Sequence, residues 1–117
     1  MVGGTTMLVE EAFLALPRTE REVIISHGAA IRLSGLRKRQ FLAQSKVRNF
    51  EAKYRTTLAK LDVAGLPDDA DFEMHEDFVM WHHWQEVSET LGHDISALEA
   101  IADQGLRYSA ESGDVSD

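Results

Sequence analysis

Apolar residues recur three or four positions apart along most of the chain, and no stretch alternates apolar and polar residues as a strand does. The longest run lies between Pro17 and Pro67, and the spacing within it predicts one helix over residues 19–61, with Thr19 as its N-cap. Its apolar stripe consists of Val23, Ala30, Leu33, Leu36, Val47, Phe50, Tyr54, Leu58 and Leu61. A helix of this length needs a partner helix, either in the same chain or across a dimer.

Two glycines, Gly28 and Gly35, lie seven residues apart inside this predicted helix. Each costs about 1 kcal/mol relative to alanine in a helix interior. They either allow another helix to approach closely on one face or divide the segment into two helices. The sequence leaves both interpretations open.

Three further helices and a tail complete the predicted fold. A short helix over residues 7–16 ends before Pro17, because a proline disfavours the helical conformation of the residue before it. After a Gly/Pro/Asp turn comes an amphipathic helix over residues 72–91, which Gly92 ends. A last short helix covers 94–106, and 109–117 form an acidic, disordered tail. The expected fold is one all-α domain over residues 1–108, a helical hairpin that forms a coiled-coil-like dimer.

Charge is segregated along the chain. Eleven of the twelve Lys and Arg residues lie between Arg18 and Lys60, whereas fifteen of the twenty Asp and Glu residues lie between Asp62 and Asp117. The two halves can neutralise each other within the chain, or each can bind a partner of opposite charge. Either interpretation favours binding over catalysis.

The composition excludes several classes of protein. The absence of cysteine rules out disulfides, thiolate catalysis and zinc–thiolate sites. No segment approaches the roughly 18 apolar residues that a membrane-spanning helix needs. We therefore expect a cytoplasmic protein that binds no membrane and carries no cofactor.

Histidines are the first candidates for chemistry. His75 and His82 lie seven residues apart on one predicted helix, with Glu86 one turn further on, but the His-Glu-x-x-His pattern of zinc proteases is absent. Surface histidines on an acidic helix are the simpler interpretation, and we predict no metal site. Arg21 and His27 have the loose spacing of some helical ribonucleases, but no nucleophile with a nearby base occurs. We expect no enzymatic activity.

Two other features suggest binding surfaces. Arg37, Lys38 and Arg39 form a basic run that Lys46 extends, which a helix contacting nucleic-acid phosphates requires. Trp81 and Trp84 lie three residues apart on the second amphipathic helix. One of these tryptophans can pack on the long helix while the other anchors a partner, as tryptophans do at interface hot spots.

Residues 47–91 resemble a family of small prokaryotic all-helical antitoxins, often encoded beside a ribonuclease-like toxin. The resemblance rests on Phe50-Glu51-Ala52-Lys53-Tyr54, on the turn from Gly65 to Asp71, and on the segment from His75 to Trp81. They match a Phe-Glu-x-Lys-Tyr element, a Gly/Asp turn and an acidic-aromatic-x-x-Trp helix. Two positions depart from the pattern, which has glycine at the position of Arg55 and often an acidic residue at that of Met80.

The resemblance implies a protein that neutralises a toxin through its acidic, aromatic helix. The partner-binding residues would be Asp69, Asp71, Glu73, Glu76, Asp77, Phe78, Trp81 and Trp84. Their carboxylates would occupy the basic surface with which a ribonuclease holds RNA phosphates, and the aromatic rings would form the desolvated centre. The alternatives are a regulator that binds operator DNA through its basic helix, and a dimeric adaptor without a toxin partner.

Overall fold

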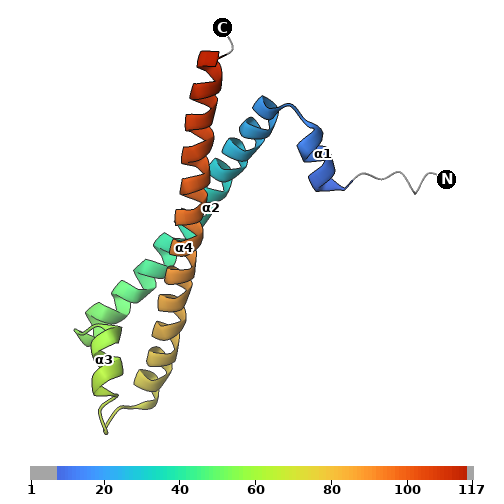
Figure 1. The fold of residues 1–117 in the computed structure, drawn as a ribbon. Helices are drawn as coiled ribbons and strands as arrows, with labels where there is room; N and C mark the ends of the chain where they lie inside the picture. The colour runs from blue at the N-terminus through green and yellow to red at the C-terminus, as the bar shows by residue number, and fades with distance from the viewer. Residues whose placement is uncertain (1–7, 116–117) are drawn as a thin grey trace, which may run out of the picture. The chain divides into compact units, whose positions relative to one another are not determined.

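The computed structural model describes the backbone of residues 8–115 and the side chains of residues 8–104. This part of the chain consists of four α-helices and contains no strand. The helices are α1 (Val9–Ala15), α2 (Arg18–Tyr54), α3 (Leu58–Ala64) and α4 (Phe72–Val115), as Figure 1 shows. Because α2 and α4 pack as a helical hairpin, the predicted all-α hairpin is confirmed.

The chain divides into two compact units. Unit 1 contains the described residues up to Leu33 together with those from Ala97 onward, and unit 2 is Ser34–Ser96. Both long helices contribute to both units. The single domain expected over residues 1–108 stays a prediction.

The break between α1 and α2 lies where the sequence predicts it. Leu16 has φ −70° and ψ 153°, the extended conformation that a following proline favours. α2 begins at Arg18, and the carbonyl oxygen of Pro17 accepts hydrogen bonds from the backbone N–H groups of Glu20 and Arg21. Thr19 therefore lies inside the first turn, and its predicted role as N-cap is wrong.

α2 is continuous through both of its glycines, so the possible division of this helix at Gly28 or Gly35 does not occur. A Cβ atom built on either glycine would meet no atom within 4 Å. Packing among the described residues therefore does not require glycine at either position.

The long helix ends earlier than predicted, at Tyr54 instead of Leu61. The next residue, Arg55, has φ +52°, a left-handed conformation that ends the helix. Thr57 then caps α3, because its Oγ1 accepts a hydrogen bond from the backbone N–H of Lys60 at 3.3 Å. Leu58 is buried as the apolar pattern predicts, but it belongs to a separate helix.

The turn between α3 and α4 follows the sequence prediction closely. Gly65 ends α3 with φ +78°, a conformation that glycine adopts without strain. Asp71 caps the next helix, because its Oδ1 accepts a hydrogen bond from the backbone N–H of Met74 at 2.9 Å.

α4 does not stop at Gly92, and this prediction is wrong. The helix continues to Val115, through the residues predicted as a separate helix at 94–106 and through most of the predicted tail at 109–117. Residues 116–117 lie outside the described part of the chain. Buried Leu91 and Ile95 hold the helix on either side of Gly92, and a Cβ on Gly92 would lie 3.1 Å from Nε2 of Gln40 on α2. The glycine therefore does not end the helix, and a Cβ at this position would press against the end of the Gln40 side chain.

The core of unit 2 surrounds one side chain, Trp81, which is fully buried between α2, α3 and α4. Its buried neighbours are Leu58 and Leu61. The partly buried residues packed against this cluster are Val47, Phe50, Tyr54, Leu66, Met74 and Phe78. The predicted stripe is therefore correct over its second half, whereas Val23 and Ala30 in unit 1 are exposed.

Candidate partner-binding surface

The inner face of α4 carries the aromatic residues that the sequence assigns to a partner. Trp81 has an exposed fraction of 0%, and its ring stacks on those of Phe50, at 5.7 Å between centroids, and Tyr54, at 6.0 Å. A partner cannot reach this ring while unit 2 is folded, so the predicted contact between Trp81 and a partner is wrong. Phe78 is half-buried against the same core.

Trp84 lies at the edge of the hairpin and is half-buried. The Nζ atom of Lys46 on α2 lies 6.0 Å from the centroid of its ring, a cation–π contact across the two helices. The ring of His83 meets it edge-on at 5.0 Å. Trp81 is therefore the tryptophan that packs in the core, whereas Trp84 keeps part of its surface accessible and its contact with a partner stays a prediction.

An ionic cluster fixes the inner edge of α4 to the end of α2. Nζ of Lys53 lies 2.6 Å from Oδ2 of Asp77 and 2.9 Å from Oε1 of Glu73. The hydroxyl of Tyr54 donates to the same Oδ2 of Asp77 at 2.5 Å. Two predicted partner residues, Glu73 and Asp77, therefore serve the hairpin itself.

The pKa values in this cluster follow from its hydrogen bonds. Donation by Lys53, and then by Tyr54, lowers the pKa of the Asp77 carboxyl. The bonds to Asp77 and Glu73 raise the pKa of Lys53 well above its ordinary value. Burial, followed by the bond to Asp77, raises the pKa of Tyr54.

The outer face of α4 presents a row that the sequence analysis did not single out. Phe72, Glu76, Val79 and His83 follow one another at spacings of four, three and four residues, within about 60° around the helix axis. All four are exposed, Phe72 by 77% and Val79 by 66%, and Met80 beside them is 43% exposed. We call these five residues the outer row.

Two predicted partner residues are accessible beside or within this row. Asp69 lies in the turn before α4, and Glu76 belongs to the row itself. Both are exposed, and neither side chain makes a hydrogen bond or ion pair with another residue in the described part of the chain. The periodicity did reveal amphipathic character, but both faces of α4 carry aromatic residues, so it could not tell the inner face from the outer one.

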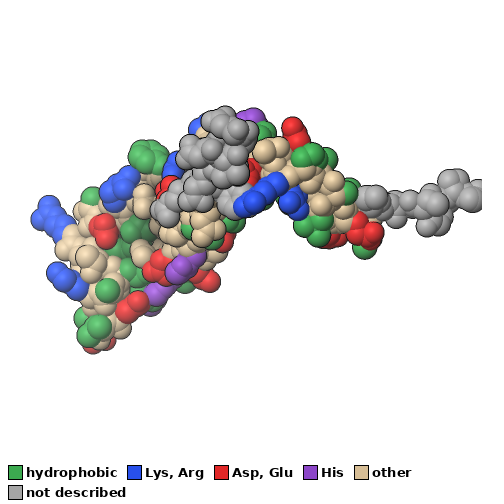
Figure 2. Space-filling view, turned by 45° about the horizontal axis from the view of Figure 1, so that its top comes forward, with side chains coloured by type: hydrophobic (Ala, Val, Ile, Leu, Met, Phe, Trp, Pro, Cys, Tyr) green, Lys and Arg blue, Asp and Glu red, His purple; other side chains and the backbone are tan. Residues whose placement is uncertain are grey.

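A second acidic surface lies where the end of α2, α3 and α4 meet. A groove of about 400 Å³ is lined by the carboxylates of Glu51, Asp62, Glu86 and Glu89 and by His82. Nε2 of His82 lies 2.7 Å from Oδ1 of Asp62, and the His82 ring meets Phe78 edge-on at 4.8 Å. In the space-filling view, histidine side chains lie among acidic ones (Figure 2). The charge of this groove suits a cationic group.

The histidines do not form a metal centre in the described residues. No group of three His, Asp or Glu side chains within residues 8–104 is arranged to hold an ion. His82 pairs with Asp62, whereas His75 is exposed on the outer side of α4.

The basic residues proposed for nucleic acid, namely Arg37, Lys38, Arg39 and Lys46, are all exposed on α2. Three consecutive residues on a helix point in directions about 100° apart, so Arg37, Lys38 and Arg39 do not lie on one face of α2. Arg39 and Lys46 share a line, but Lys46 lies over Trp84.

The spacing of Arg21 and His27, which some helical ribonucleases share, does not bring the two residues onto one face of α2. Arg21 and His27 point about 120° apart around α2. Arg21 is half-buried against α1, and His27 is exposed. The two side chains therefore lie on different sides of α2 within one copy of the chain.

No protein-family model matches the chain, and neither the curated proteins nor the solved structures include a significant match. Separately, no helix in the described part of the chain is long and apolar enough to cross a membrane.

Proposed function

We propose that this protein binds another protein through the outer row of α4 and acts, without catalysis, as the antitoxin of a cytoplasmic toxin–antitoxin pair. The observation that carries the proposal is the exposure of Phe72, Val79 and Met80 on a helix whose opposite face is already packed. Large apolar side chains that are exposed together on one face, with polar residues around them, mark interaction surfaces on proteins.

The spacing of the outer row fits a known mode of recognition. A helix that lies in an apolar groove of its partner places apolar anchors at positions such as i and i+7, and Phe72 and Val79 have this spacing, with the carboxylate of Glu76 between them. Asp69 and Glu76 at the same surface favour a partner with basic residues around that groove. A ribonuclease toxin has such residues, because it must bind RNA phosphates.

The backbone at Arg55 supports the resemblance to antitoxins. The antitoxin pattern has glycine at this position, and Arg55 has a positive φ, the conformation in which glycine is favoured. Lys53 of the Phe-Glu-x-Lys-Tyr element forms an ion pair with Asp77 of the acidic-aromatic helix, so these two elements of the pattern contact each other in the hairpin.

A dimer through the outer side of α2 forms part of the proposal. Ile24, Gly28 and Ile31 lie on that side at spacings of four and three, and Gly35 continues the spacing. Ile24 and Ile31 are exposed, and the space above both glycines is open. Glycines that cost helix stability without serving the described packing favour the close approach of a helix from a second copy.

Co-expression with the product of the neighbouring gene tests the function. We expect the two proteins to purify as a complex and growth inhibition by the neighbour to be relieved. Phe72→Ser combined with Val79→Ser should lose both effects. Val63→Ser should keep them, because Val63 is 91% exposed on α3, away from the outer row. A neighbour that inhibits growth equally with and without this protein would refute the proposal.

A further inference from the structure

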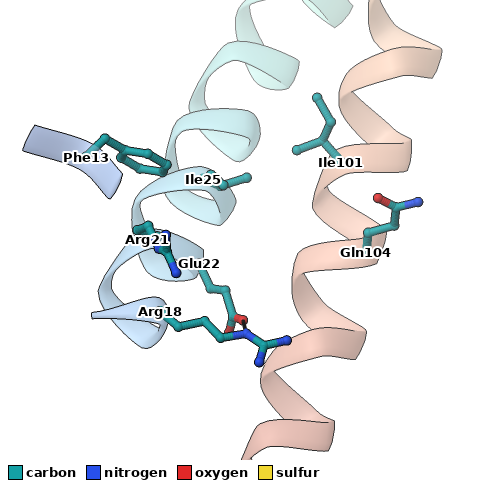
Figure 3. Close-up of a pocket in the computed structure, with 7 residues that line it drawn as sticks. All are labelled: Phe13, Arg18, Arg21, Glu22, Ile25, Ile101 and Gln104. Atoms are coloured by element: carbon teal, nitrogen blue, oxygen red, sulfur yellow. Dashed lines mark ion pairs between the residues drawn. The ribbon is translucent and has the colours of Figure 1, made fainter. Parts of the chain in front are cut away.

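Unit 1 contains an apolar pocket of about 350 Å³ that is separate from the outer row of α4. Its apolar walls are Phe13 from α1, Ile25 from α2 and Ile101 from α4 (Figure 3). The polar residues that line it are Arg18, Arg21, Glu22 and Gln104. Small-molecule sites occupy pockets of about 300–1,000 Å³ with mainly apolar walls and few polar groups, so this one falls at the small end of that range.

The charged groups in the pocket are not equivalent. Glu22 is only 8% exposed, and its Oε1 lies 3.5 Å from Nε of Arg18, one turn earlier on α2. Arg21 is half-buried, and its side chain makes no hydrogen bond or ion pair with another residue in the described part of the chain. The pocket therefore contains one guanidinium that pairs with a carboxylate and a second that is available to an anion.

We propose that this pocket binds a small aliphatic carboxylate, with the hydrocarbon body against Phe13, Ile25 and Ile101 and the carboxylate on Arg21. A planar guanidinium binds a carboxylate through two parallel hydrogen bonds, which makes the head group specific. At roughly 30 Å³ for each non-hydrogen atom, the volume accommodates about ten to twelve such atoms. Medium-chain fatty acids have this size and this combination of groups.

Residues from three helices enclose the pocket, and its size favours a small carboxylate molecule over a single side chain of a partner protein. The pocket holds a body larger than most single side chains, and its one available charged group requires one anionic head. The proposal does not depend on the toxin-binding function, because no residue of the outer row lines this pocket.

The test is calorimetric titration of the full chain with decanoate and with decanol, which differ in the head group alone. We expect saturable binding of decanoate at one site, about tenfold tighter than binding of decanol. Arg21→Gln should remove that difference between the ligands while leaving the helical content unchanged. Arg32→Gln is the matched control, because Arg32 is exposed on the same helix and does not line the pocket.

Three results would overturn the proposal. The first is no saturable binding of decanoate, and the second is equal affinity of the wild type for both ligands. The third is an Arg21→Gln variant that keeps the preference for decanoate. If decanoate does not bind and Arg21→Gln instead dissociates a dimer or a protein complex, the pocket serves a protein partner and not a small carboxylate.

Discussion

The Nζ atom of Lys53 lies 2.6 Å from Oδ2 of Asp77, and this ion pair joins the last turn of α2 to the second turn of α4. Tyr54, the neighbour of Lys53, donates its hydroxyl hydrogen to the same carboxylate oxygen. Lys53 and Tyr54 of α2 thus bind Asp77 of α4 and join the two helices next to Trp81. Glu73 and Asp77 on the acidic helix therefore stabilise the hairpin, and the exposed Phe72 and Val79 lie on the opposite side of the helix.

Removal of this carboxylate should weaken unit 2. We expect Asp77→Ala to lower the free energy of unfolding by about 1–2 kcal/mol, because the half-buried Tyr54 hydroxyl loses its acceptor. Glu76→Ala, which removes the neighbouring exposed carboxylate, should change it by less than about 0.5 kcal/mol. Urea unfolding followed by circular dichroism measures both. Equal effects of the two substitutions would contradict the structural role of Asp77.

The same cluster predicts how stability depends on pH. The pKa of Asp77 is lower in the folded chain, so its contribution is complete above the unfolded pKa, about 4, and is lost as the pH falls through the folded value. The pKa of Lys53 is raised, so its contribution is complete below the unfolded value, about 10.4, and is lost as the pH rises through the folded one.

Melting temperatures of the wild type and Asp77→Asn measure the acidic limb. The difference between them should be constant from about pH 5 to pH 8 and should shrink below about pH 4, where Asp77 takes up a proton. A difference that does not change down to about pH 2 would show that the Asp77 carboxylate contributes no charge-dependent stability.

Replacement of Arg55 by glycine, the residue that the antitoxin pattern has at this position, should stabilise the protein. Because a left-handed conformation costs about 1–2 kcal/mol for a residue with a side chain, Arg55→Gly should raise the free energy of unfolding by about 0.5–1 kcal/mol after the larger entropy of unfolded glycine is subtracted. Arg39→Gly, in the interior of α2, should lower it by about 1 kcal/mol. Destabilisation by both substitutions would argue against the left-handed turn.

Two helix glycines test the proposed dimer. Gly28→Ala with Gly35→Ala should stabilise the monomer, because alanine favours the helix and the added methyl groups meet no neighbour. The same methyl groups should weaken self-association by about tenfold or more in sedimentation equilibrium, since they separate the paired helices. Ser34→Ala, on α2 but outside the glycine row, is the control. Unchanged self-association in the double variant would exclude this face as the dimer interface.

Periodicity predicted the helices and most of the core, because an apolar side chain every three or four residues must be buried against something. Periodicity could not predict the structural role of individual glycines. Gly65 ends a helix and Gly92 makes room for Gln40, although both follow an apolar helical pattern. The difference is the approach of α2 to α4, which neighbouring residues in the sequence do not encode.

The proposed binding surfaces were less predictable for a similar reason. The aromatic-acidic spacing indicated one face of α4 as the binding surface, but that face packs inward around Trp81. Phe72 and Val79 can be identified as exposed only when the structure shows that Phe50 and Tyr54 of α2 pack against Trp81 on the opposite face of α4. The pocket around Arg21 combines three segments that are distant in sequence, so no local pattern could reveal it.

The most direct test of the central claim is the affinity for the co-expressed toxin, measured calorimetrically with variants of exposed apolar residues. Phe72→Ser with Val79→Ser should weaken binding by about 100-fold, since two anchors of the interface are lost, while Val63→Ser should stay within about twofold of the wild type. If the double variant keeps wild-type affinity while Trp84→Ala loses it, the partner binds the hairpin edge and the outer row of α4 is not the interface.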